Sequence, residues 1–267
     1  MPSLSLIVPC FNEAPVIEAS YLRMKAVLEG MERAEGIEGR IIFVNDGSTD
    51  GTGAILSAFS AQDEHIRVLH LSRNFGHEAA VTAGLHRCES DYAVLIDADL
   101  QEHPELIPEL LETLRREEAN VVYCVRVARR GEGWLKRFTA KWFYRSLNRL
   151  SELPIPLDTG DFRLIDRKVL DEFNRFREKG KYIRGIISWM GFKQVAFSFT
   201  RDPRYAGETK YPMRKMLHFA GTAMLYFSKR PLKLATGLGF LATMAGIAFG
   251  LWTLFGKIFG FTNAETG

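Results

Sequence analysis

Short apolar runs alternate with helix-like segments over the first 125 residues, and no other feature of the sequence constrains the fold as strongly. The runs are apolar along most of their length instead of at every second position, which is typical of strands buried on both faces of a sheet. They lie at Leu4–Val8, Arg40–Val44, Ile66–Leu71, Tyr92–Ile96 and Val121–Val125. The helix-like segments between and after them lie at 16–31, 52–62, 76–87 and 104–118. This order predicts an α/β fold in which helices cover both faces of a mostly parallel sheet.

Polar and acidic side chains follow four of these runs, where each predicted strand ends. The four sequences are Pro9-Cys10-Phe11-Asn12-Glu13, Asn45-Asp46-Gly47-Ser48, Ser72-Arg73-Asn74 and Asp97-Ala98-Asp99. The carboxyl ends of parallel strands lie at one edge of a sheet, and ligands bind in the crevice beyond that edge. We therefore expect one polar site assembled from four loops, which is a stronger indication than any single motif.

The segment Asp97-Ala98-Asp99-Leu100-Gln101 offers two carboxylates and an amide oxygen at alternate positions. Hard cations such as Mg²⁺ and Mn²⁺ prefer oxygen ligands of this kind and share their coordination shell with phosphate oxygens. An Asp-x-Asp triplet alone is common by chance. Its place at the same edge as Asp46 and Glu13 favours a site for a metal ion and a phosphate.

The loop Asn45–Gly51 begins like a calcium-binding EF-hand loop, but its twelfth position is Ser57 instead of a bidentate glutamate, and it follows a strand. We expect a tight turn that aims Asp46 at a ligand, with Asp50 capping the next helix. The sequence has neither a P-loop lysine motif nor a Gly-x-Gly-x-x-Gly fingerprint, which argues against mononucleotide kinases and ordinary dinucleotide-binding enzymes.

The second half of the chain begins with a basic segment. Between Arg126 and Arg149 there are eight basic residues and one acid, Glu132. Four of the basic residues recur at every fourth position, so they form a stripe along a helix; they are Arg137, Lys141, Arg145 and Arg149. Tryptophan and phenylalanine beside such a stripe are typical of a helix in a membrane interface, and a surface helix packed on the domain is the alternative. A second amphipathic segment, Met213–Phe227, leads toward the C-terminal apolar stretch.

That stretch, Leu234–Gly256, has 23 residues without a charge. A helix of this length crosses a hydrocarbon core of ~30 Å, and a buried helix of a soluble protein is the alternative. The flanking basic residues are Lys229, Arg230 and Lys233 on one side and Lys257 on the other. This bias predicts that the N-terminal domain lies on the cytoplasmic side. Gly246 and Gly250 are spaced as in helix–helix contact faces, although glycine is common in any membrane helix.

The cysteines and two of the histidines are expected to be structural. Cys10, Cys88 and Cys124 sit in or beside apolar runs, and no pair has metal-ligand spacing, so we expect buried, reduced thiols without a metal or redox role. His77 and His103 each lie at the start of a predicted helix, and neither has a carboxylate partner that the sequence assigns.

The strand-end motifs together resemble the family 2 glycosyltransferases of the GT-A fold. The segments that carry the resemblance are Val8–Glu13, Val44–Gly51, Ser72–His77 and Asp97–Gln101. Gly160–Arg167 and Gly207–Tyr211 are similar, more narrowly, to polyprenyl-phosphate glycosyltransferases such as bactoprenol glucosyltransferases, dolichyl-phosphate mannose synthases and the enzyme that transfers formamido-arabinose to undecaprenyl phosphate. The resemblance spans nearly the whole chain and implies a Rossmann-like, mostly parallel GT-A domain.

The resemblance implies a role for each matched position. Pro9, Asn12, Glu13 and Asp46 would hold the nucleoside, and Arg73 and Asp97 would line the nucleotide pocket. Asp99 and Gln101 would ligate the Mg²⁺ or Mn²⁺ ion that bridges the donor diphosphate. The implied donor is a UDP- or GDP-linked sugar, and the implied acceptor is a polyprenyl monophosphate, undecaprenyl or dolichyl.

We name Asp161 as the catalytic residue, which either takes a proton or orients the acceptor or the metal, with a structural aspartate at a strand end as the alternative. A phosphate acceptor has a second pKa near ~6 and needs no strong base, but it does need cations. The candidates are Arg126, Arg137, Arg201, Arg204 and Lys210, and contact with the membrane surface is the alternative for each. The segment Arg201–Gly207 is expected to be a mobile loop that closes over the donor.

The predicted organisation has a nucleotide-sugar half, an acceptor half with an interfacial helix and a mobile loop, a juxtamembrane helix, a transmembrane helix and a tail. Their ranges are 1–130, 131–211, 212–231, 232–257 and 258–267. Close relatives usually have two membrane helices and a longer tail, whereas this sequence ends at Gly267 soon after one apolar stretch. The segment Ser3–Val8 is too short for a signal peptide and is expected to be a strand.

The predicted function is inverting sugar transfer from a nucleotide donor to a polyprenyl phosphate at the cytoplasmic face of a membrane, by a homo-oligomer. The net charge of +3 says little about partners, and we expect no nucleic acid among them. A processive polysaccharide synthase is one alternative, although its Gln-x-x-Arg-Trp motif is absent. A membrane-anchored nucleotide-binding module without catalytic activity is the other.

Overall fold

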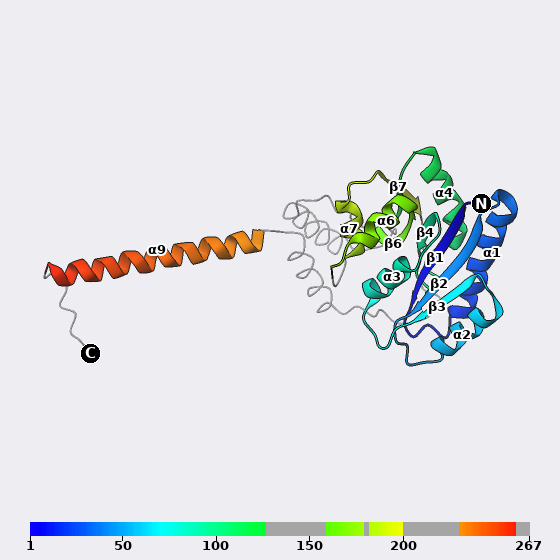
Figure 1. Cartoon of the computed structure of the whole chain (residues 1–267), viewed down its shortest axis with the longest axis horizontal. Helices are drawn as coiled ribbons and strands as arrows, with labels where there is room; N and C mark the ends of the chain where they lie inside the picture. Colours follow the sequence, from blue (N-terminus) through cyan, green and yellow to red (C-terminus); the bar gives the residue numbers. More distant parts are fainter. Residues whose placement is uncertain (127–158, 179–181, 200–229, 260–267) are drawn as a thin grey trace, which may run out of the picture.

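The computed structural model describes residues 1–126, 159–178, 182–199 and 230–259. In these residues one sheet has the strand order β3-β2-β1-β4-β6-β5-β7 (Figure 1). The strands are β1 Ser3–Cys10, β2 Glu38–Asn45, β3 Ile66–His70, β4 Tyr92–Leu95, β5 Val121–Arg126, β6 Thr159–Asp166 and β7 Gln194–Phe199. The helices are α1 Ile17–Glu35, α2 Thr52–Gln62, α3 His77–His86, η1 Pro104–Leu106 (a single 3₁₀ turn), α4 Ile107–Arg116, α6 Arg167–Arg175, α7 Ile183–Trp189 and α9 Arg230–Ile258.

Strand β6 runs antiparallel to both of its neighbours, β4 and β5. The remaining pairings, β1 with β2, β1 with β4, β2 with β3 and β5 with β7, are parallel, so the sheet is mostly parallel as predicted. Because β6 is reversed, its first residues lie at the edge where the other strands end, and Thr159 pairs with Val125 near the end of β5. This reversal brings Asp161 to the edge of the sheet at which β1, β2 and β4 end.

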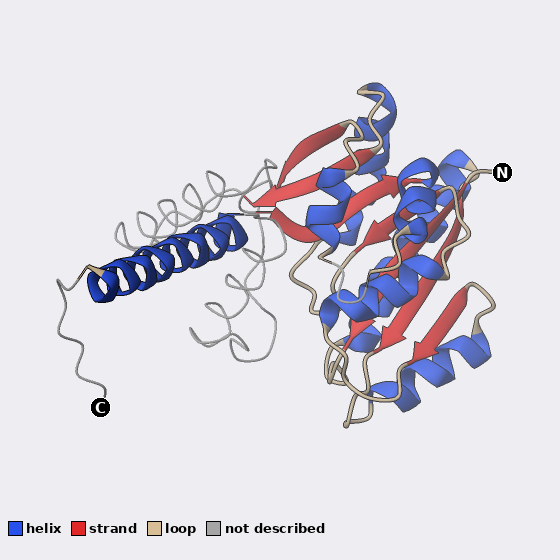
Figure 2. Cartoon of the chain, turned by 60° about the vertical axis from the view of Figure 1, so that its left-hand side comes forward, coloured by secondary structure: helices blue, strands red, loops and turns tan. Residues whose placement is uncertain are grey.

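Helices cover both faces of the sheet (Figure 2). On one face α1, α2 and α4 pack against alternate strand residues, among them Leu6 and Val8 of β1. On the other face α3, α6 and α7 pack against residues of the opposite parity, among them Ile7 of β1 and Val44 of β2. Both sets of side chains are therefore buried, which explains why the central strands are continuously apolar. Each such side chain contributes about 1.5–3 kcal/mol by leaving water.

The predicted strands and helices agree with the observed ones to within a few residues, and α2 spans the predicted range. Helix α1 continues beyond its predicted end to Glu35, where Gly36 takes a left-handed φ of 65°. Glycine is favoured at such helix ends because it lacks a Cβ. The N-cap of α2 is Gly51 instead of the predicted Asp50, whose carboxylate accepts a hydrogen bond of 3.0 Å from the backbone N–H of Thr52, the first residue of α2.

The three cysteines are free and buried, as predicted. Burial raises the pKa of each thiol, at Cys10, Cys88 and Cys124. A thiol with a raised pKa stays protonated at neutral pH and is a poor nucleophile. Their contribution is therefore to the packing of the core.

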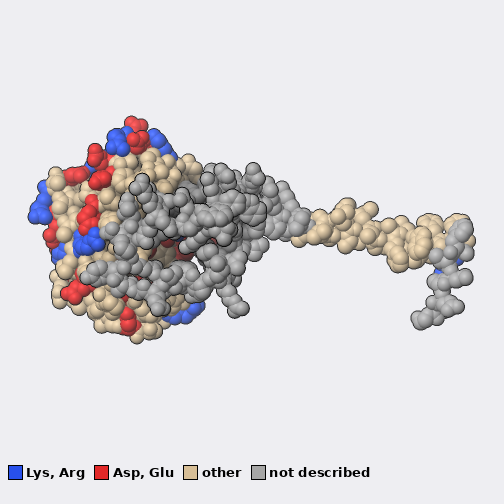
Figure 3. Space-filling view, turned by 180° about the vertical axis from the view of Figure 1, so that it is seen from behind, with Lys and Arg blue, Asp and Glu red and all other residues tan. Residues whose placement is uncertain are grey.

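Helix α9 extends away from the sheet and its covering helices in Figure 1. Its segment Ala235–Ile258 is long and apolar enough to cross a membrane, and no other helix in the described part of the chain is. Figure 3 shows that its surface is almost free of Lys, Arg, Asp and Glu. Large apolar side chains along it are open to the surroundings, with Phe249 65% and Trp252 62% exposed. An apolar surface of this length needs an apolar environment, which agrees with the predicted C-terminal apolar helix.

Several predictions fall on residues outside the described ranges. These are the basic interfacial helix, the segment Met213–Phe227, the loop Arg201–Gly207 and the candidate cations Arg137, Arg201, Arg204 and Lys210. Arg126 ends β5, but its side chain is outside the described part. These assignments, and the predicted domain limits, stay predictions.

Candidate active site

The loops after β1 and β2 are joined to each other by side-chain to backbone hydrogen bonds. The carboxamide of Asn12 accepts from the N–H of Thr49 at 2.8 Å, and the N–H of Asn12 donates to Ser48 at 3.1 Å. The N–H of Glu13 donates to the hydroxyl of Thr52 at 2.9 Å. Asn12 has a φ of 57°, a left-handed conformation that asparagine tolerates better than most residues. Two of the predicted nucleoside residues, Asn12 and Glu13, thus lie on a fixed ridge where β1 and β2 end.

Asp46 fixes the loop that follows β3. Its Oδ1 accepts from the N–H of Phe75 at 2.7 Å, and its Oδ2 accepts from the N–H of Gly76 at 2.9 Å. The side chain is buried, with 3% of the residue exposed. The carboxylate predicted to point at a ligand therefore also ties the β2 and β3 loops together.

Gly47 allows the two loops to approach. Its φ is 66°, and a Cβ at this position would lie 2.3 Å from the carbonyl carbon of Arg73 and 2.6 Å from the backbone nitrogen of Asn74. Any side chain would displace the Arg73–Asn74 backbone. The guanidinium of Arg73 lies 4.2 Å from the ring centre of Phe75, and both residues are exposed in the loop after β3. A cationic group stacked on an aromatic ring is suited to hold an anionic ligand at this position.

The acidic triplet forms a turn beyond the end of β4. Asp99 Oδ1 accepts from the N–H of Gln101 at 3.1 Å, and Leu100 between them has a φ of 59°. The N–H of Asp97 donates to the carboxylate of Glu102 at 3.2 Å, and Glu102 is only 2% exposed. A buried acid that no sequence motif marks, Glu102, therefore holds this turn in place.

The described residues contain no group of three or more His, Cys, Asp or Glu side chains arranged to hold a metal ion by themselves. A Mg²⁺ ion in a nucleotide site is usually held by one or two carboxylates, several waters and the phosphates of the substrate. A carboxylate at Asp99 and a carboxamide at Gln101, two residues apart in this turn, fit such a site by the chemistry of their oxygen donors.

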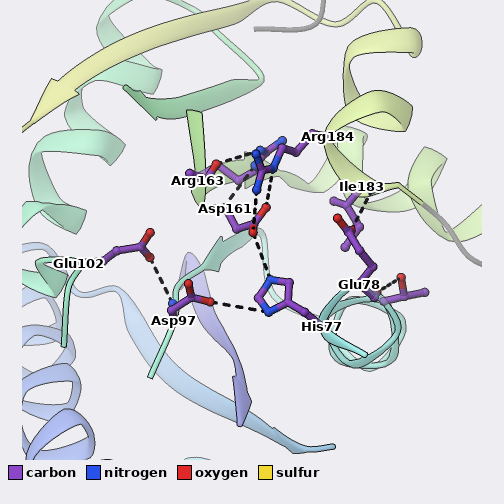
Figure 4. Close-up of polar contacts among 10 residues, drawn as sticks. His77, Glu78, Asp97, Glu102, Asp161, Arg163, Ile183 and Arg184 are labelled. Carbon is purple, nitrogen blue, oxygen red and sulfur yellow. Dashed lines mark hydrogen bonds and ion pairs between the residues drawn. The ribbon is translucent and has the colours of Figure 1, made fainter. Parts of the chain in front are cut away.

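Asp161 lies at the centre of a network of charged side chains (Figure 4). Arg184 of α7 donates two hydrogen bonds to its carboxylate, from Nε to Oδ1 at 2.8 Å and from Nη2 to Oδ2 at 3.0 Å. His77, the first residue of α3, places Nε2 3.2 Å from Oδ2 of the same carboxylate. The other ring nitrogen of His77, Nδ1, lies 3.8 Å from Oδ1 of Asp97. Four elements, β4, β6, α3 and α7, therefore meet at Asp161.

The sequence assigns no carboxylate partner to His77, whereas the fold places its ring between Asp97 and Asp161. Burial opposes the charged form of the ring, but the ion pair of Nε2 with Asp161 and the charges of Asp97 and Glu78 outweigh it and raise the pKa of His77 to about 9. The same contacts act on Asp161: burial raises its pKa, yet His77 and Arg184 hold that pKa well below the usual range. The directions of these pKa shifts favour an imidazolium at His77 and a carboxylate at Asp161 at neutral pH. His103 lies at the N-terminal end of η1, where a helix start was predicted.

Two more charged residues surround this network. The guanidinium of Arg163 is buried, with 3% of the residue exposed, and donates to the carbonyl oxygens of Gly160 and Asp161 at 3.3 Å each. Glu78 accepts from the N–H of Ile183 at 3.1 Å, which ties the start of α7 to α3. Burial raises the pKa of Glu78, and the charge of Asp161 raises it further.

The structure brings most of the predicted site residues to one edge of the sheet: Asn12, Glu13, Asp46, Arg73, Asp97, Asp99, Gln101 and Asp161. Pro9 lies in β1, one residue before the strand ends. Sequence reasoning missed His77, Arg184, Arg163, Glu78 and Glu102. For His77 one signal was available, since Gly76-His77 directly follows the polar end of a strand. Arg184 carried no such signal, because it lies far along the chain on a short helix.

A family model described as Glycosyl transferase family 2 matches residues 5–173, more than half of the chain. The chain belongs to glycosyl transferase family 2. Among the relatives of this glycosyltransferase, "Uncharacterized glycosyltransferase YkcC" of Bacillus subtilis (strain 168) is 46% identical over 96% of this chain and 77% of its own length. "Prophage bactoprenol glucosyl transferase homolog" of Escherichia coli (strain K12) is 37% identical over 99% of this chain and 84% of its own length. "Bactoprenol glucosyl transferase" of Shigella phage SfX is 36% identical over 96% of this chain and 82% of its own length.

Solved structures show the same GT-A fold at low identity. The mannosyltransferase PcManGT of Pyrobaculum calidifontis, in complex with GDP-Man and Mn²⁺, has a TM-score of 0.54 at 18% identity over 93% of this chain and 81% of that one. TarS 1–349 of S. aureus in complex with UDP-GlcNAc has a TM-score of 0.56 at 14% identity over 84% of this chain. This glycosyltransferase spans 65% of that TarS chain, which is less than two thirds of it.

Proposed function

We propose that this glycosyltransferase moves a sugar from a nucleoside diphosphate donor to a polyprenyl phosphate, with inversion at the anomeric carbon. The observation that carries the proposal is the similarity, at 36–37% identity over nearly the whole chain, to proteins named bactoprenol glucosyl transferase. Solved neighbours of the same fold hold UDP, UDP-GlcNAc or GDP-Man, which supports a nucleotide-linked donor here.

The donor is proposed to lie along the ridge formed by the β1, β2 and β3 loops. Pro9, Asn12, Glu13 and Asp46 are the proposed nucleoside contacts, and Arg73 and Asp97 the proposed walls of the nucleotide pocket. The exposed guanidinium of Arg73, braced against Phe75, is well placed to meet a phosphate or a base.

The proposed reaction is a single displacement. A phosphate oxygen of the lipid attacks the anomeric carbon, the bond from that carbon to the nucleotide's terminal phosphate oxygen breaks, and the nucleoside diphosphate leaves. A monophosphate with a second pKa near ~6 is largely ionised at neutral pH, so no side chain has to remove a proton. Asp161 suits this scheme because its two cationic partners keep its pKa well below the usual range, which makes it a poor base. Its proposed role is therefore to orient groups at the reaction centre.

Asp99 and Gln101 are proposed to hold a divalent cation, Mg²⁺ or Mn²⁺, together with the donor diphosphate. When bound, such an ion neutralises the charge that develops on the leaving nucleotide. The support is the oxygen-rich turn after β4 and the presence of Mn²⁺ in structures of the same fold.

The acceptor is proposed to approach from the side of Asp161. Candidate phosphate contacts are Arg126, Arg137, Arg201, Arg204 and Lys210, all at or beyond the ends of β5 and β7 in the sequence. The support is that β5 and β7 end at the same edge as β4, so the chain leaves that edge where these cations follow in the sequence, and an anionic head group needs cations.

Helix α9 is proposed to span the membrane, with the catalytic domain on the cytoplasmic side. The support is its length and apolar surface and the basic residues that precede its apolar stretch, Lys229, Arg230 and Lys233. A homo-oligomer is proposed through the face that contains Gly246 and Gly250, where a Cβ would meet nothing within 4 Å and a second helix has room to approach.

The test is an assay of the full chain in detergent or nanodiscs. It is incubated with UDP-glucose, UDP-GlcNAc or GDP-mannose, with undecaprenyl or dolichyl phosphate, and with Mg²⁺ or Mn²⁺. Lipid extraction and mass spectrometry detect the lipid-linked sugar, and proton NMR of the product reports the anomeric configuration. The proposal fails if no donor gives a lipid-linked product while the Escherichia coli relative is active in the same assay.

A further inference from the structure

His77 stands between the two halves of the proposed site. Its Nε2 faces Asp161 at 3.2 Å and its Nδ1 faces Asp97 at 3.8 Å. Asp97 follows β4 on the proposed donor side, whereas Asp161 lies near the start of β6 on the proposed acceptor side (Figure 4). No other side chain drawn in Figure 4 contacts both carboxylates.

The position of the ring is fixed from the nucleotide side. His77 is the first residue of α3, and Gly76 before it has a φ of 98°, a conformation that glycine adopts readily and other residues rarely do. The N–H of Gly76 is held by Asp46, which also holds Phe75. The imidazole therefore rests on a loop whose shape depends on a proposed nucleoside residue.

We propose that His77 is a positioning residue for sugar transfer, whose imidazolium holds the donor-side carboxylate of Asp97 and the acceptor-side carboxylate of Asp161 in fixed register across the reaction centre. This inference rests on the proposed function for the roles of the two carboxylates. The link itself rests on the contacts of the two ring nitrogens.

A cation is required at this position for two reasons. A neutral imidazole that donates from Nε2 to Asp161 would present the lone pair of Nδ1 to the carboxylate of Asp97, which is repulsive. A positive charge between Asp97 and Asp161 also reduces the repulsion between these two carboxylates.

The charged groups that face the ring are Asp97 from β4, Asp161 from β6 and Glu78 from α3, and behind Asp161 lie Arg184 and Arg163. The three acids, Asp97, Asp161 and Glu78, all favour the positively charged form of the ring. The pKa of His77, raised to about 9, agrees with this balance.

The experiment compares three substitutions in the full chain. His77→Ala removes both contacts, His77→Gln keeps a hydrogen-bond donor without charge, and His77→Lys keeps a positive charge. The matched control is His86→Ala, an exposed histidine at the other end of α3. Steady-state kinetics with donor and lipid acceptor give kcat and KM separately, and thermal unfolding identifies any variant that fails to fold.

We expect kcat to fall about 10- to 100-fold in His77→Ala and His77→Gln, the range for loss of one charge-assisted contact. We expect KM for the donor to change little, His77→Lys to recover part of the loss, and His86→Ala to match the wild type. An equal fall in all three His77 variants, recovery by glutamine but not lysine, or no fall in any of them would overturn the proposal.

A second measurement does not depend on turnover. Nitrogen-15 spectra of the six histidines report the protonation of each ring, and the spectrum of His77→Gln assigns the signal of His77. We expect His77 to be doubly protonated at neutral pH. We expect the midpoint of its titration to fall by about one unit or more in Asp161→Asn, because the substitution removes a carboxylate that favours the charged ring. A midpoint near that of the exposed His86 would overturn the link. If the wild type makes no lipid-linked sugar, the proposed function fails, and the titration still decides whether the imidazolium joins the two carboxylates.

Discussion

Replacing Gly47 by alanine tests whether the close approach of the β2 and β3 loops builds the nucleotide side of the site. The new methyl carbon would lie 2.3 Å from the carbonyl carbon of Arg73 and 2.6 Å from the nitrogen of Asn74, both backbone atoms that cannot rotate away. The left-handed backbone costs an alanine about 1–2 kcal/mol. Forcing apart packed groups adds about 1–3 kcal/mol. The sum predicts a loss of roughly 2–5 kcal/mol in the free energy of unfolding.

Gly51 in the same loop is the matched control. Its φ is −72°, and a Cβ there would meet nothing closer than the Cβ of Ala14 at 4.0 Å. Alanine lowers the entropy of the unfolded chain, which stabilises by about 0.4–1 kcal/mol, but it is a poorer residue than glycine before a helix. These effects oppose each other, so Gly51→Ala is expected to change stability by less than about 1 kcal/mol.

Both variants are measured as full chains in detergent by thermal unfolding and by titration with UDP or GDP. At about 2–4 °C per kcal/mol for a domain of this size, Gly47→Ala should lower the unfolding temperature by roughly 4–20 °C and Gly51→Ala should leave it within roughly 4 °C. Nucleotide affinity should fall only in Gly47→Ala, because the loop that carries Arg73 moves. Equal unfolding temperatures and equal affinities for the two variants would refute the reasoning.

Three further outcomes are expected. Asp161→Asn should lower kcat by about 100-fold or more, because it leaves the cations of His77 and Arg184 without their shared carboxylate, and single-turnover assays separate this loss from weaker binding. The folded protein keeps the His77 proton up to a pKa of about 9, whereas the unfolded chain releases it near the ordinary value of 6.5. The stabilising effect of that charge should therefore be complete below pH 6.5 and lost as the pH rises through 9. Across this window the unfolding temperature of the wild type should fall more steeply than that of His77→Gln. Chelation with EDTA should abolish activity, and added Mn²⁺ should restore it. Asp99→Ala should need a higher Mn²⁺ concentration than the wild type to reach half of its maximal rate. Full activity of Asp99→Ala at the Mn²⁺ concentration that suffices for the wild type would contradict the metal assignment.

The local elements of the fold follow from neighbouring residues in the chain. A strand buried on both faces must be apolar throughout, so the runs at Leu4–Val8 and Tyr92–Ile96 mark β1 and β4 without knowledge of any contact. A parallel sheet then collects the strand ends at one edge, which is why Asp46, Asp97 and Asp99 could be assigned to one site in advance.

The tertiary structure decided what surrounds those residues. The reversal of β6 cannot be read from its own sequence, since the direction of a strand depends on which neighbours it pairs with, and this reversal is what carries Asp161 to the same edge as Asp97. The charge of His77 depends on carboxylates 20 and 84 positions further along the chain, at Asp97 and Asp161. The sequence by itself identified the acidic edge of the sheet. The electrostatic environment of a side chain depends on distances in space, so only the fold could place His77 between Asp97 and Asp161 and favour its positive charge.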